Sequence, residues 1–368
     1  MDFTKNIILS TEKIAENKSR IDERTTADTL IFLWEPIASG CRLLRCFGNS
    51  PILNVPDMID GRAVSEMGAY CFSRSRPRFP EKIYKTIFID IENQETTLES
   101  GQAFNQKDFD FSAFGTELDG TFLEEITLPD CTATLHNAAF YNCRKLKKLS
   151  VGTAISGIGS DEFMNDSRLE HLIIRGKDSE ATGLPLILER IAENITVSFC
   201  PDSSSSPESI VFFPEYYEWL DEISPAHIFS RSIHGEGFRM RKSFENGILD
   251  YRKYDSFFDN ALTVESPESL CKIALNRLRW PSGLENIFKE KYETAIETHL
   301  NTAFSLAIKS KDFSLLQFIC EHFSPDMTVL SEAMEHCIET DWSEGNAFLM
   351  EQKHNTFSEK TFEFDLDF

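Results

Sequence analysis

Five basic side chains gather in a short segment of a chain that is otherwise strongly acidic. They are Arg231, His234, Arg239, Arg241 and Lys242. Two glycines, Gly235 and Gly237, lie among them and would leave backbone N–H groups accessible. Guanidinium groups and free N–H groups bind carboxylates and phosphates. The segment therefore suggests a site for a small anionic ligand, with His234 as acid/base or as a further ligand of the anion.

A second interpretation of this basic segment needs no ligand. Acidic side chains precede it closely, at Glu215, Glu218, Asp221 and Glu222, and ion pairs within the chain would occupy the positive charges. One observation separates the two. Convergence of the five side chains on an accessible pocket favours a ligand, and a carboxylate partner for each favours internal pairing.

Motifs for other chemistry are absent from the sequence. There is no G-x-S-x-G, no H-E-x-x-H, no phosphate-binding loop that ends in Lys-Ser/Thr and no G-x-G-x-x-G. The eight histidines never reach metal-ligand spacing, and the nine cysteines are scattered without a C-x-x-C pair. We therefore expect that the protein is not an enzyme and has no catalytic residue, metal site or cofactor. We expect the cysteines to be free thiols in a reducing compartment.

Charge and composition exclude two classes of partner. The 368 residues carry a formal net charge of −23, which opposes attachment to nucleic acid or to anionic lipid. No stretch approaches the roughly 18 apolar residues of a membrane span, and the N-terminus lacks the apolar core of a secretory signal. The expectation is a soluble cytoplasmic protein, since surface display would require a leader that had been removed.

The first half of the sequence contains a repeat of 23 residues, and these repeats would position any site there. Apolar residues recur at this spacing in the pattern L-x-x-[IL]-x-[LVI], followed by a turn and a buried aromatic residue. The aligned sets are Leu123, Leu146 and Leu169; Ile126, Leu149 and Leu172; Leu128, Val151 and Ile174; Leu135 and Ile158; Phe140 and Phe163. One such unit cannot bury its own apolar side, so the units must stack as a solenoid.

Weaker copies of the pattern precede these three. Residues 64–72 fit the segment that leads to the buried aromatic, and Tyr84, Ile87 and Ile89 fit the strand. Between about 92 and 118 the period breaks. Residues 41–64 supply a first strand and a series of turns suited to capping the exposed end of the array.

Residues between the inward positions of each strand should face solvent. They form the predicted partner-binding face: Thr86, Phe88, Glu125, Thr127, Lys148, Ser150, His171 and Ile173. Phe88 and Ile173 are apolar where exposure is expected, which suits an interaction surface. The alternative is that the second half of the chain covers part of this face.

Four segments together resemble a known repeat family. They are Pro51–Gly61, Val64–Gly68, Ile126–Pro129 and Ala139–Leu146, and over about residues 40–176 they are similar to the BspA-type leucine-rich repeat found in many bacteria. The resemblance implies a right-handed superhelix with a parallel strand sheet on one face, used for protein recognition. A role in host adhesion does not carry over, because this chain is short and shows no export signal.

The second half has a different period. Ser266-Pro267 reads as the start of a helix with Leu270, Ile273, Ala274 and Leu278 on one face. Two helical pairs over about 299–354, the first with a tight turn at residues 309–312, resemble degenerate ankyrin-type hairpins or a plain helical bundle.

The sequence thus predicts an α+β protein in three parts. These are a leucine-rich-repeat domain with an N-terminal cap (1–200), an aromatic connecting region (201–265) and an all-α module (266–368). The expected function is non-catalytic interaction with a protein partner of unknown identity, and the alternative is the anionic-ligand binder or enzyme built around Arg231–Lys242.

Overall fold

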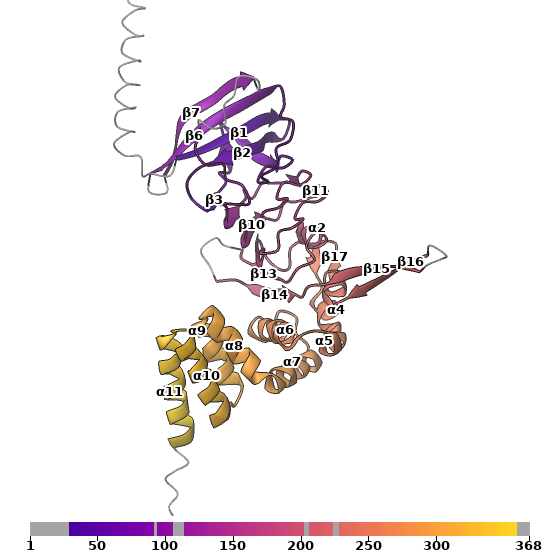
Figure 1. Ribbon diagram of the computed structural model, residues 1–368, viewed down its shortest axis with the longest axis vertical. Coiled ribbons are helices and arrows are strands. Elements are labelled where there is room, and N and C mark those ends of the chain that lie inside the picture. Colours follow the sequence, from indigo (N-terminus) through magenta and orange to yellow (C-terminus); the bar gives the residue numbers. More distant parts are fainter. Residues whose placement is uncertain (1–28, 92–93, 106–113, 202–205, 224–227, 359–368) are drawn as a thin grey trace, which may run out of the picture. The chain divides into compact units, whose positions relative to one another are not determined.

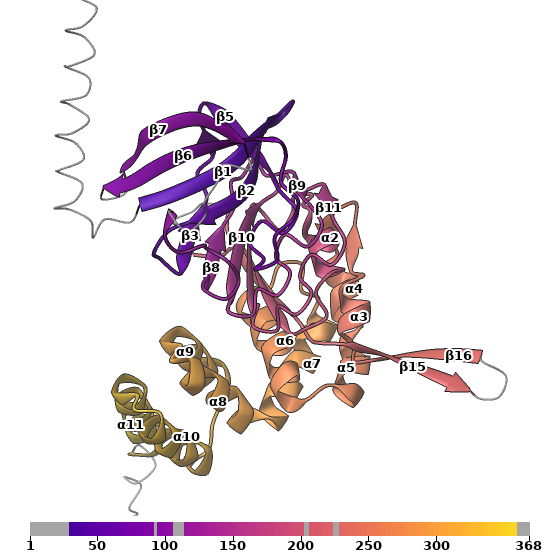
Figure 2. The same ribbon diagram turned by 45° about the horizontal axis from the view of Figure 1, so that its top comes forward.

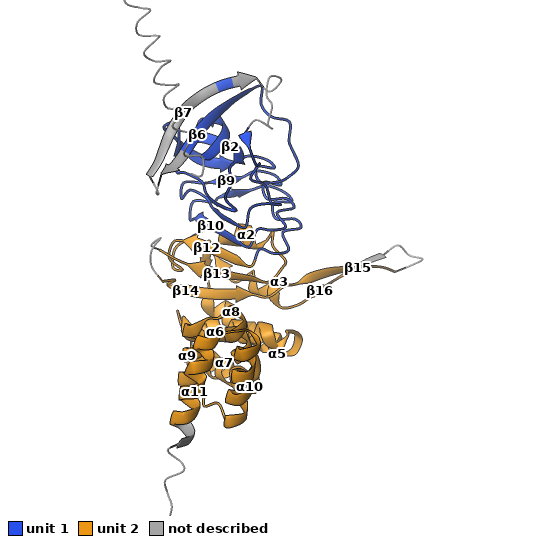
Figure 3. Ribbon diagram, turned by 60° about the vertical axis from the view of Figure 1, so that its left-hand side comes forward, with its two compact units in different colours: residues 1–169 blue, residues 170–368 orange. Residues whose placement is uncertain are grey.

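The computed structural model describes residues 29–91, 94–105, 114–201, 206–223 and 228–358. The chain forms two compact units, Met1–Leu169 and Glu170–Phe368 (Figure 3). Its architecture is a β-solenoid of about six turns with parallel sheets, followed by a helical C-terminal region, as the sequence predicts. The finer division into three parts remains a prediction.

Three short strands of the first unit stack as a parallel ladder (Figure 2). They are β3 (Ile52–Asn54), β8 (Glu125–Thr127) and β10 (Lys148–Gly152). Leu53, Ile126 and Leu149 are paired in register along the ladder and are buried. The predicted 23-residue step from β8 to β10 is confirmed, and β3, which the sequence assigns to the cap, is itself the first strand of a coil.

A second parallel ladder forms the other side of the same coils. It contains β5 (Arg62–Met67), β9 (Thr134–Leu135) and β11 (Gly157–Ile158), with β4 (Met58–Ile59) paired to β5. Met67 pairs with Leu135, and Leu135 pairs with Ile158. Each coil is therefore a strand, a turn and a second strand. The sequence pattern aligns Leu135 with Ile158 but predicts a strand only for the first ladder.

Stacked aromatic rings close the coils at one end. The ring centroids of Phe72 and Phe140 are 5.0 Å apart, and those of Phe140 and Phe163 are 5.3 Å apart. All three side chains are almost fully buried. The predicted aromatic position is thus a continuous column, and burial of its rings stabilises the coils.

The backbone before each stacked ring turns in the same unusual way. Tyr70, Ala138 and Asp161, two residues before the rings, have φ of +58°, +58° and +57°. In the following turn, the Asn165 side-chain amide donates to Oδ1 of Asn142 at 2.8 Å. Positive φ is costly for residues other than glycine, so its recurrence shows that the stacking of the coils dictates the local conformation.

Four longer strands extend the second ladder as an antiparallel sheet. They are β1 (Thr29–Ile37), β2 (Gly40–Phe47), β6 (Lys82–Ile91) and β7 (Gln94–Asn105). Strand β2 pairs in parallel with β5 and antiparallel with β1, and β6 lies between β1 and β7. The sheet covers the edge of the first coil and therefore acts as its cap.

The expectation that Thr86 and Phe88 on β6 face solvent is wrong. Thr86 is fully buried and accepts a hydrogen bond from Nε1 of Trp34 at 3.0 Å, and Phe88 packs its ring edge-on against Phe32. Neighbouring residues on the opposite face of β1, such as Leu33, are buried as well. Both faces of this sheet are covered, so alternate side chains of β6 point into two different buried layers.

The segment that carries β6 and β7 leaves the stack after Phe72 and returns at Gly120. The Gly120 N–H donates to the Phe72 carbonyl oxygen at 2.8 Å, so the two ends of the insertion meet. A Cβ on Gly120 would lie 2.1 Å from Cα of Cys143. Only glycine fits this close approach.

The second unit begins with three paired strands. Strands β12 (His171–Arg175) and β13 (Ile195–Phe199) are parallel, and β14 (Ser209–Phe213) pairs antiparallel with β13. The short helix α2 (Leu184–Leu188) lies between β12 and β13 in the sequence. Strands β15 (Tyr217–Ile223) and β16 (Ile228–His234) form a two-stranded hairpin that extends away from the rest of this unit (Figure 1).

Helices make up most of the remaining chain. Their bounds, with one small hairpin, are α3 (Gly237–Met240), β17 (Phe244–Glu245), β18 (Ile248–Leu249), α4 (Tyr251–Ser256), α5 (Phe258–Val264), α6 (Pro267–Arg279), α7 (Asn286–Thr298), α8 (Leu300–Ser310), α9 (Phe313–His322), α10 (Met327–Glu339) and α11 (Ser343–Ser358). The Ser266 side chain caps α6, and Lys311 takes a left-handed conformation in the predicted turn before α9. The helical pairs are confirmed, and the ankyrin-type resemblance remains a prediction.

A buried ion pair joins three of these helices. Nε and Nη2 of Arg277 on α6 donate to the two carboxylate oxygens of Asp255 on α4 at 2.8 and 2.9 Å, and both side chains are fully buried. The Tyr292 hydroxyl on α7 donates to the same carboxylate at 2.7 Å. Arg277 also donates to the carbonyls of Trp280 and Ser282. This network is well satisfied, so removal of one partner would leave a buried charge uncompensated.

Removal of the middle ring of the aromatic column should weaken the first unit. We expect Phe140→Ala to lower the free energy of unfolding by about 3–5 kcal/mol, because it removes a stacked, buried ring and leaves a cavity. The control is Met164→Ala, whose side chain is 52% exposed, with a change of about 0.5 kcal/mol or less. Urea unfolding of the full chain measures both, and equal losses would contradict a special role for the column.

Loss of Asp255 should be equally severe in the second unit. Asp255→Ala leaves the Arg277 guanidinium buried without its carboxylate, which predicts a loss of about 3–5 kcal/mol in urea unfolding. The matched control is Asp259→Ala, which breaks the exposed ion pair with Lys291 and should cost about 1 kcal/mol or less. A comparable loss in the control would show that burial of the pair does not matter.

Candidate functional site

The first candidate site is the solvent-facing side of β3, β8 and β10. Ile52, Glu125 and Lys148 form one column across these strands. Ile52 is 51% exposed, and Nζ of Lys148 lies 3.1 Å from the Glu125 carboxylate, with the two side chains 41% and 40% exposed. Glu124 and Lys147 repeat the ion pair one position earlier, at 2.7 Å. The column therefore presents an apolar side chain beside paired charges.

The next column of this face is less open than the sequence suggests. Asn54 is exposed and Thr127 is half-buried, but Ser150 is only 7% exposed. The expectation that Ser150 faces solvent freely is therefore wrong. A serine side chain is too short to extend beyond its neighbours, whereas the long side chain of Lys148 does.

The two remaining predicted face residues belong to the second unit. His171 and Ile173 lie on β12, opposite Thr196 and Ser198 of β13. His171 is exposed and Ile173 is half-buried. The predicted apolar exposure at Ile173 is thus partial.

Sequence reasoning missed Ile52 and Asn54 as members of this face. The signal was present, because Leu53, Val55 and Pro56 repeat the inward positions and the turn proline of residues 126–129. The 23-residue step did not reach them, since the inserted segment separates the first coil from the second.

The basic segment of the second unit is largely paired within the chain. Arg231 forms an ion pair with Glu218, and Nζ of Lys242 lies 3.0 Å from the Glu189 carboxylate. The other members of the segment have partners too: a carboxylate oxygen of Glu236 lies 3.4 Å from Nη1 of Arg239, and the ring of His234 stacks on Tyr217 with centroids 4.9 Å apart. Internal pairing therefore describes this segment better than a free anion site.

Arg241 is a structural residue rather than a ligand-binding one. Its side chain is buried and donates to the carbonyl oxygens of Glu193 and Pro214. Burial lowers the pKa of the guanidinium to about 10, and the group lies 5.2 Å from the centroid of the Tyr216 ring. It joins the segments before and after the hairpin.

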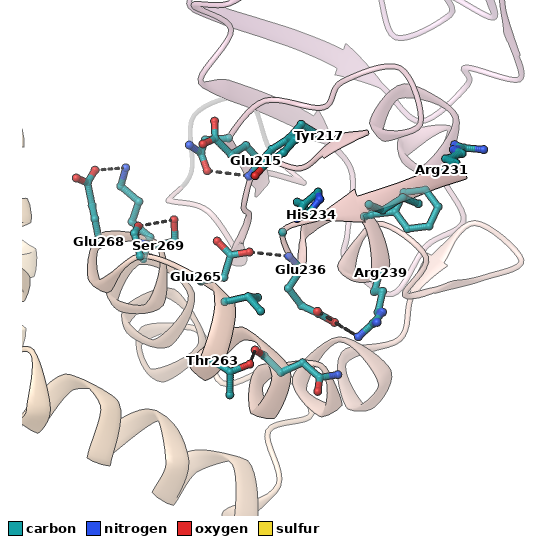
Figure 4. A pocket seen from close by; sticks show the side chains of 18 residues that line it. Glu215, Tyr217, Arg231, His234, Glu236, Arg239, Thr263, Glu265, Glu268 and Ser269 are labelled. Atoms are coloured by element: carbon teal, nitrogen blue, oxygen red, sulfur yellow. Dashed lines mark hydrogen bonds and ion pairs between the residues drawn. The ribbon is translucent and has the colours of Figure 1, made fainter. Parts of the chain in front are cut away.

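A cavity of about 1130 Å³ opens beside this segment, at the base of the β15–β16 hairpin (Figure 4). Arg231, His234 and Arg239 line it, and Arg241 and Lys242 do not. The five basic side chains therefore do not converge on one pocket, which is the observation that would favour an anion site. The physical reason is that Arg239, Arg241 and Lys242 lie on and just after the helical turn of α3, which directs them to different sides.

Carboxylates outnumber the arginine and lysine side chains that line this cavity by four to three. Glu215, Glu236, Glu265 and Glu268 all line it. The Glu265 carboxylate accepts a hydrogen bond from the Glu236 N–H at 2.6 Å and lies at the centre of Figure 4. Within the described residues, neither Glu215 nor Glu265 forms an ion pair. The cavity therefore complements a cation better than the anion that the sequence suggests.

The pKa values of these carboxyl groups differ in direction. Burial raises the pKa of Glu265, and the neighbouring charge of Glu215 raises it further. Burial also raises the pKa of Glu236. The pKa of Glu268 is lowered, because Lys272 donates a hydrogen bond to its carboxylate at 2.7 Å.

The comparison with protein families identifies the repeats. Residues 83–182 match the model of the BspA type leucine-rich repeat region in six copies. This part of the chain is a BspA-type leucine-rich repeat region. Searches of curated proteins and of solved structures found no match. The BspA-type match ends just before α2, and the coil formed by β3 and β5 precedes it.

Neither a membrane span nor a metal site is evident in the described parts of the chain. None of the helices in these ranges is both long and apolar enough to cross a bilayer. In the same ranges, no group of three or more His, Cys, Asp or Glu residues has the arrangement of a metal site. All nine cysteines are free thiols.

The opposite pKa shifts of Glu265 and Glu268 predict opposite effects on stability. A carboxyl whose pKa is raised by folding binds its proton more tightly when folded, so the stability that it adds at low pH is lost as the pH rises through the folded pKa. Glu265→Gln should therefore raise the free energy of unfolding more at pH 7 than at pH 4.

Glu268 is the matched control for this experiment. Its lowered pKa means that the charged form stabilises the folded state above the ordinary glutamate pKa, so Glu268→Gln should lower stability at pH 7 and less so at pH 4. Urea unfolding at both pH values measures the effect. The same sign for both variants would contradict the electrostatic description of the cavity.

Proposed function

We propose that this protein is a non-catalytic interaction module that presents the solvent-facing side of β3, β8 and β10 to a protein partner. Leucine-rich repeats of this family commonly serve protein interactions. The observation that carries the proposal is the column of Ile52, Glu125 and Lys148, which lies in register on three paired strands and is at least 40% exposed at each side chain. A cytoplasmic location in a bacterium is part of the same proposal.

The chemistry of this column suits a reversible contact. An exposed ion pair such as Glu125–Lys148 contributes little to folding, about 0–1 kcal/mol, so its charges are available to pair with a partner instead. Ile52 supplies apolar area whose burial by a partner is favourable. Regular strands hold these side chains in place and reduce the entropy lost on binding.

The alternative of an anionic-ligand binder or enzyme around Arg231–Lys242 has less support. Arg231, Arg239 and Lys242 each have a carboxylate partner, and Arg241 is buried against carbonyl groups. An anion would have to displace these contacts, which favours the interaction module.

Introduction of one charge on the face should remove partner binding. We expect Ile52→Asp to reduce the recovery of specific partners at least five-fold in affinity capture followed by mass spectrometry, because it places a carboxylate beside Glu125. Met164→Asp is the matched control, since Met164 is 52% exposed and Ile52 is 51% exposed, and Met164 lies outside the three strands. If both variants stay folded and retain every partner, the proposed face is wrong.

A further inference from the structure

The β15–β16 hairpin carries four large apolar or aromatic side chains that are exposed to solvent. Tyr217, Trp219 and Leu220 are each more than half exposed, and Ile233 is 37% exposed. Large exposed apolar and aromatic side chains that lie together mark interaction surfaces, and tryptophan and tyrosine often dominate their energetics.

Contacts within the hairpin hold these side chains in defined positions. On one face Tyr217 stacks on His234, and Nε1 of Trp219 donates to Asp221 at 2.5 Å. Leu220 lies on the other face, where it is directly opposite Arg231 in the register. The surface is therefore preorganised, which lowers the entropic cost of binding.

The outer edges of the hairpin are available for strand addition. In the part of the chain that the structure describes, β15 and β16 pair only with each other. An unpaired edge offers a row of backbone N–H and C=O groups to an extended peptide. Strand β15 carries Glu218, Asp221 and Glu222, whereas β16 carries Arg231, so the charge of β15 favours a basic segment.

The cavity continues this surface at the base of the hairpin. Tyr217, Ile233 and His234 belong to both. Beyond them lie Glu215 and Glu265, the two carboxylates of the cavity lining that form no ion pair with another described residue. A volume of about 1130 Å³ exceeds the space that one lysine or arginine side chain requires, so such a side chain can enter from an added strand.

We propose that the β15–β16 hairpin and its basal cavity bind an extended basic segment of a partner protein. The segment adds to the outer edge of β15 and packs apolar side chains against Trp219 and Leu220. A lysine or arginine of the segment enters the cavity and pairs with Glu215 and Glu265. A second copy of this chain is a poor occupant, because two chains of net charge −23 repel each other.

A peptide selection tests this proposal even while the partner is unidentified. A phage-displayed library of random dodecapeptides is selected on the immobilised full chain at physiological salt and depleted on the Trp219→Ser variant. We expect enriched peptides to carry lysine or arginine among alternating apolar residues. The most enriched peptide is then synthesised with a fluorescein label and measured by fluorescence anisotropy.

Charge-neutral variants separate the site from general attraction to an acidic protein. We expect Glu215→Gln with Glu265→Gln to weaken binding of the peptide at least ten-fold. The matched control is Glu290→Gln with Glu297→Gln on α7, which removes two exposed charges elsewhere and should change binding less than two-fold. Ile52→Asp should leave it unchanged, so this proposal and that of the repeat face fail independently.

Three results would overturn the proposal. These are a selection that enriches acidic peptides or none, equal weakening by the two double variants, and a concentration-dependent dimer that Trp219→Ser abolishes. The last result, seen by size-exclusion chromatography with light scattering, would identify a second copy as the occupant. Thermal unfolding of each variant establishes that it is folded.

Discussion

A single coil of this protein cannot bury its own apolar side chains, and the rest of the structure follows from that constraint. Inward-facing residues of neighbouring coils, such as Ile126 and Leu149, cover one another, and the Phe72–Phe140–Phe163 column does the same at the aromatic end. In each unit the stack of parallel strands also ends against another element. In the first unit β2 pairs with β5, and in the second the direction reverses at β14, against which α6 packs.

The repeats could be predicted from the sequence because the single spacing of 23 residues fixes several positions of each coil at once. The step from Ile126 to Leu149 recurs at the aromatic residues Phe140 and Phe163, so the register is overdetermined. Thr86 could not be placed in the same way. Period-two alternation separates the two faces of a strand, but it does not reveal whether the second face is covered, and at β6 both are.

Charge was the least predictable property of the candidate sites. The cluster at Arg231–Lys242 is visible in the sequence, but its partners are not, because an ion pair such as Lys242–Glu189 joins residues that are far apart in the chain. Arg277 and Asp255 show the same limit, since nothing in their sequence context indicates that both are fully buried. The buried Arg241 and Arg277 stabilise the second unit, whereas the exposed side chains of Arg231, Arg239 and Lys242 form ion pairs.

The close meeting of Phe72 and Gly120 has a consequence for how such a protein can change. A solenoid coil interacts with its spatial neighbour and not with the chain that connects the two. Since one backbone hydrogen bond joins the exit and return points, the length of the intervening chain is nearly free. At this junction evolution or protein engineering can shorten, lengthen or replace the β6–β7 segment while the register of the coils on either side is preserved.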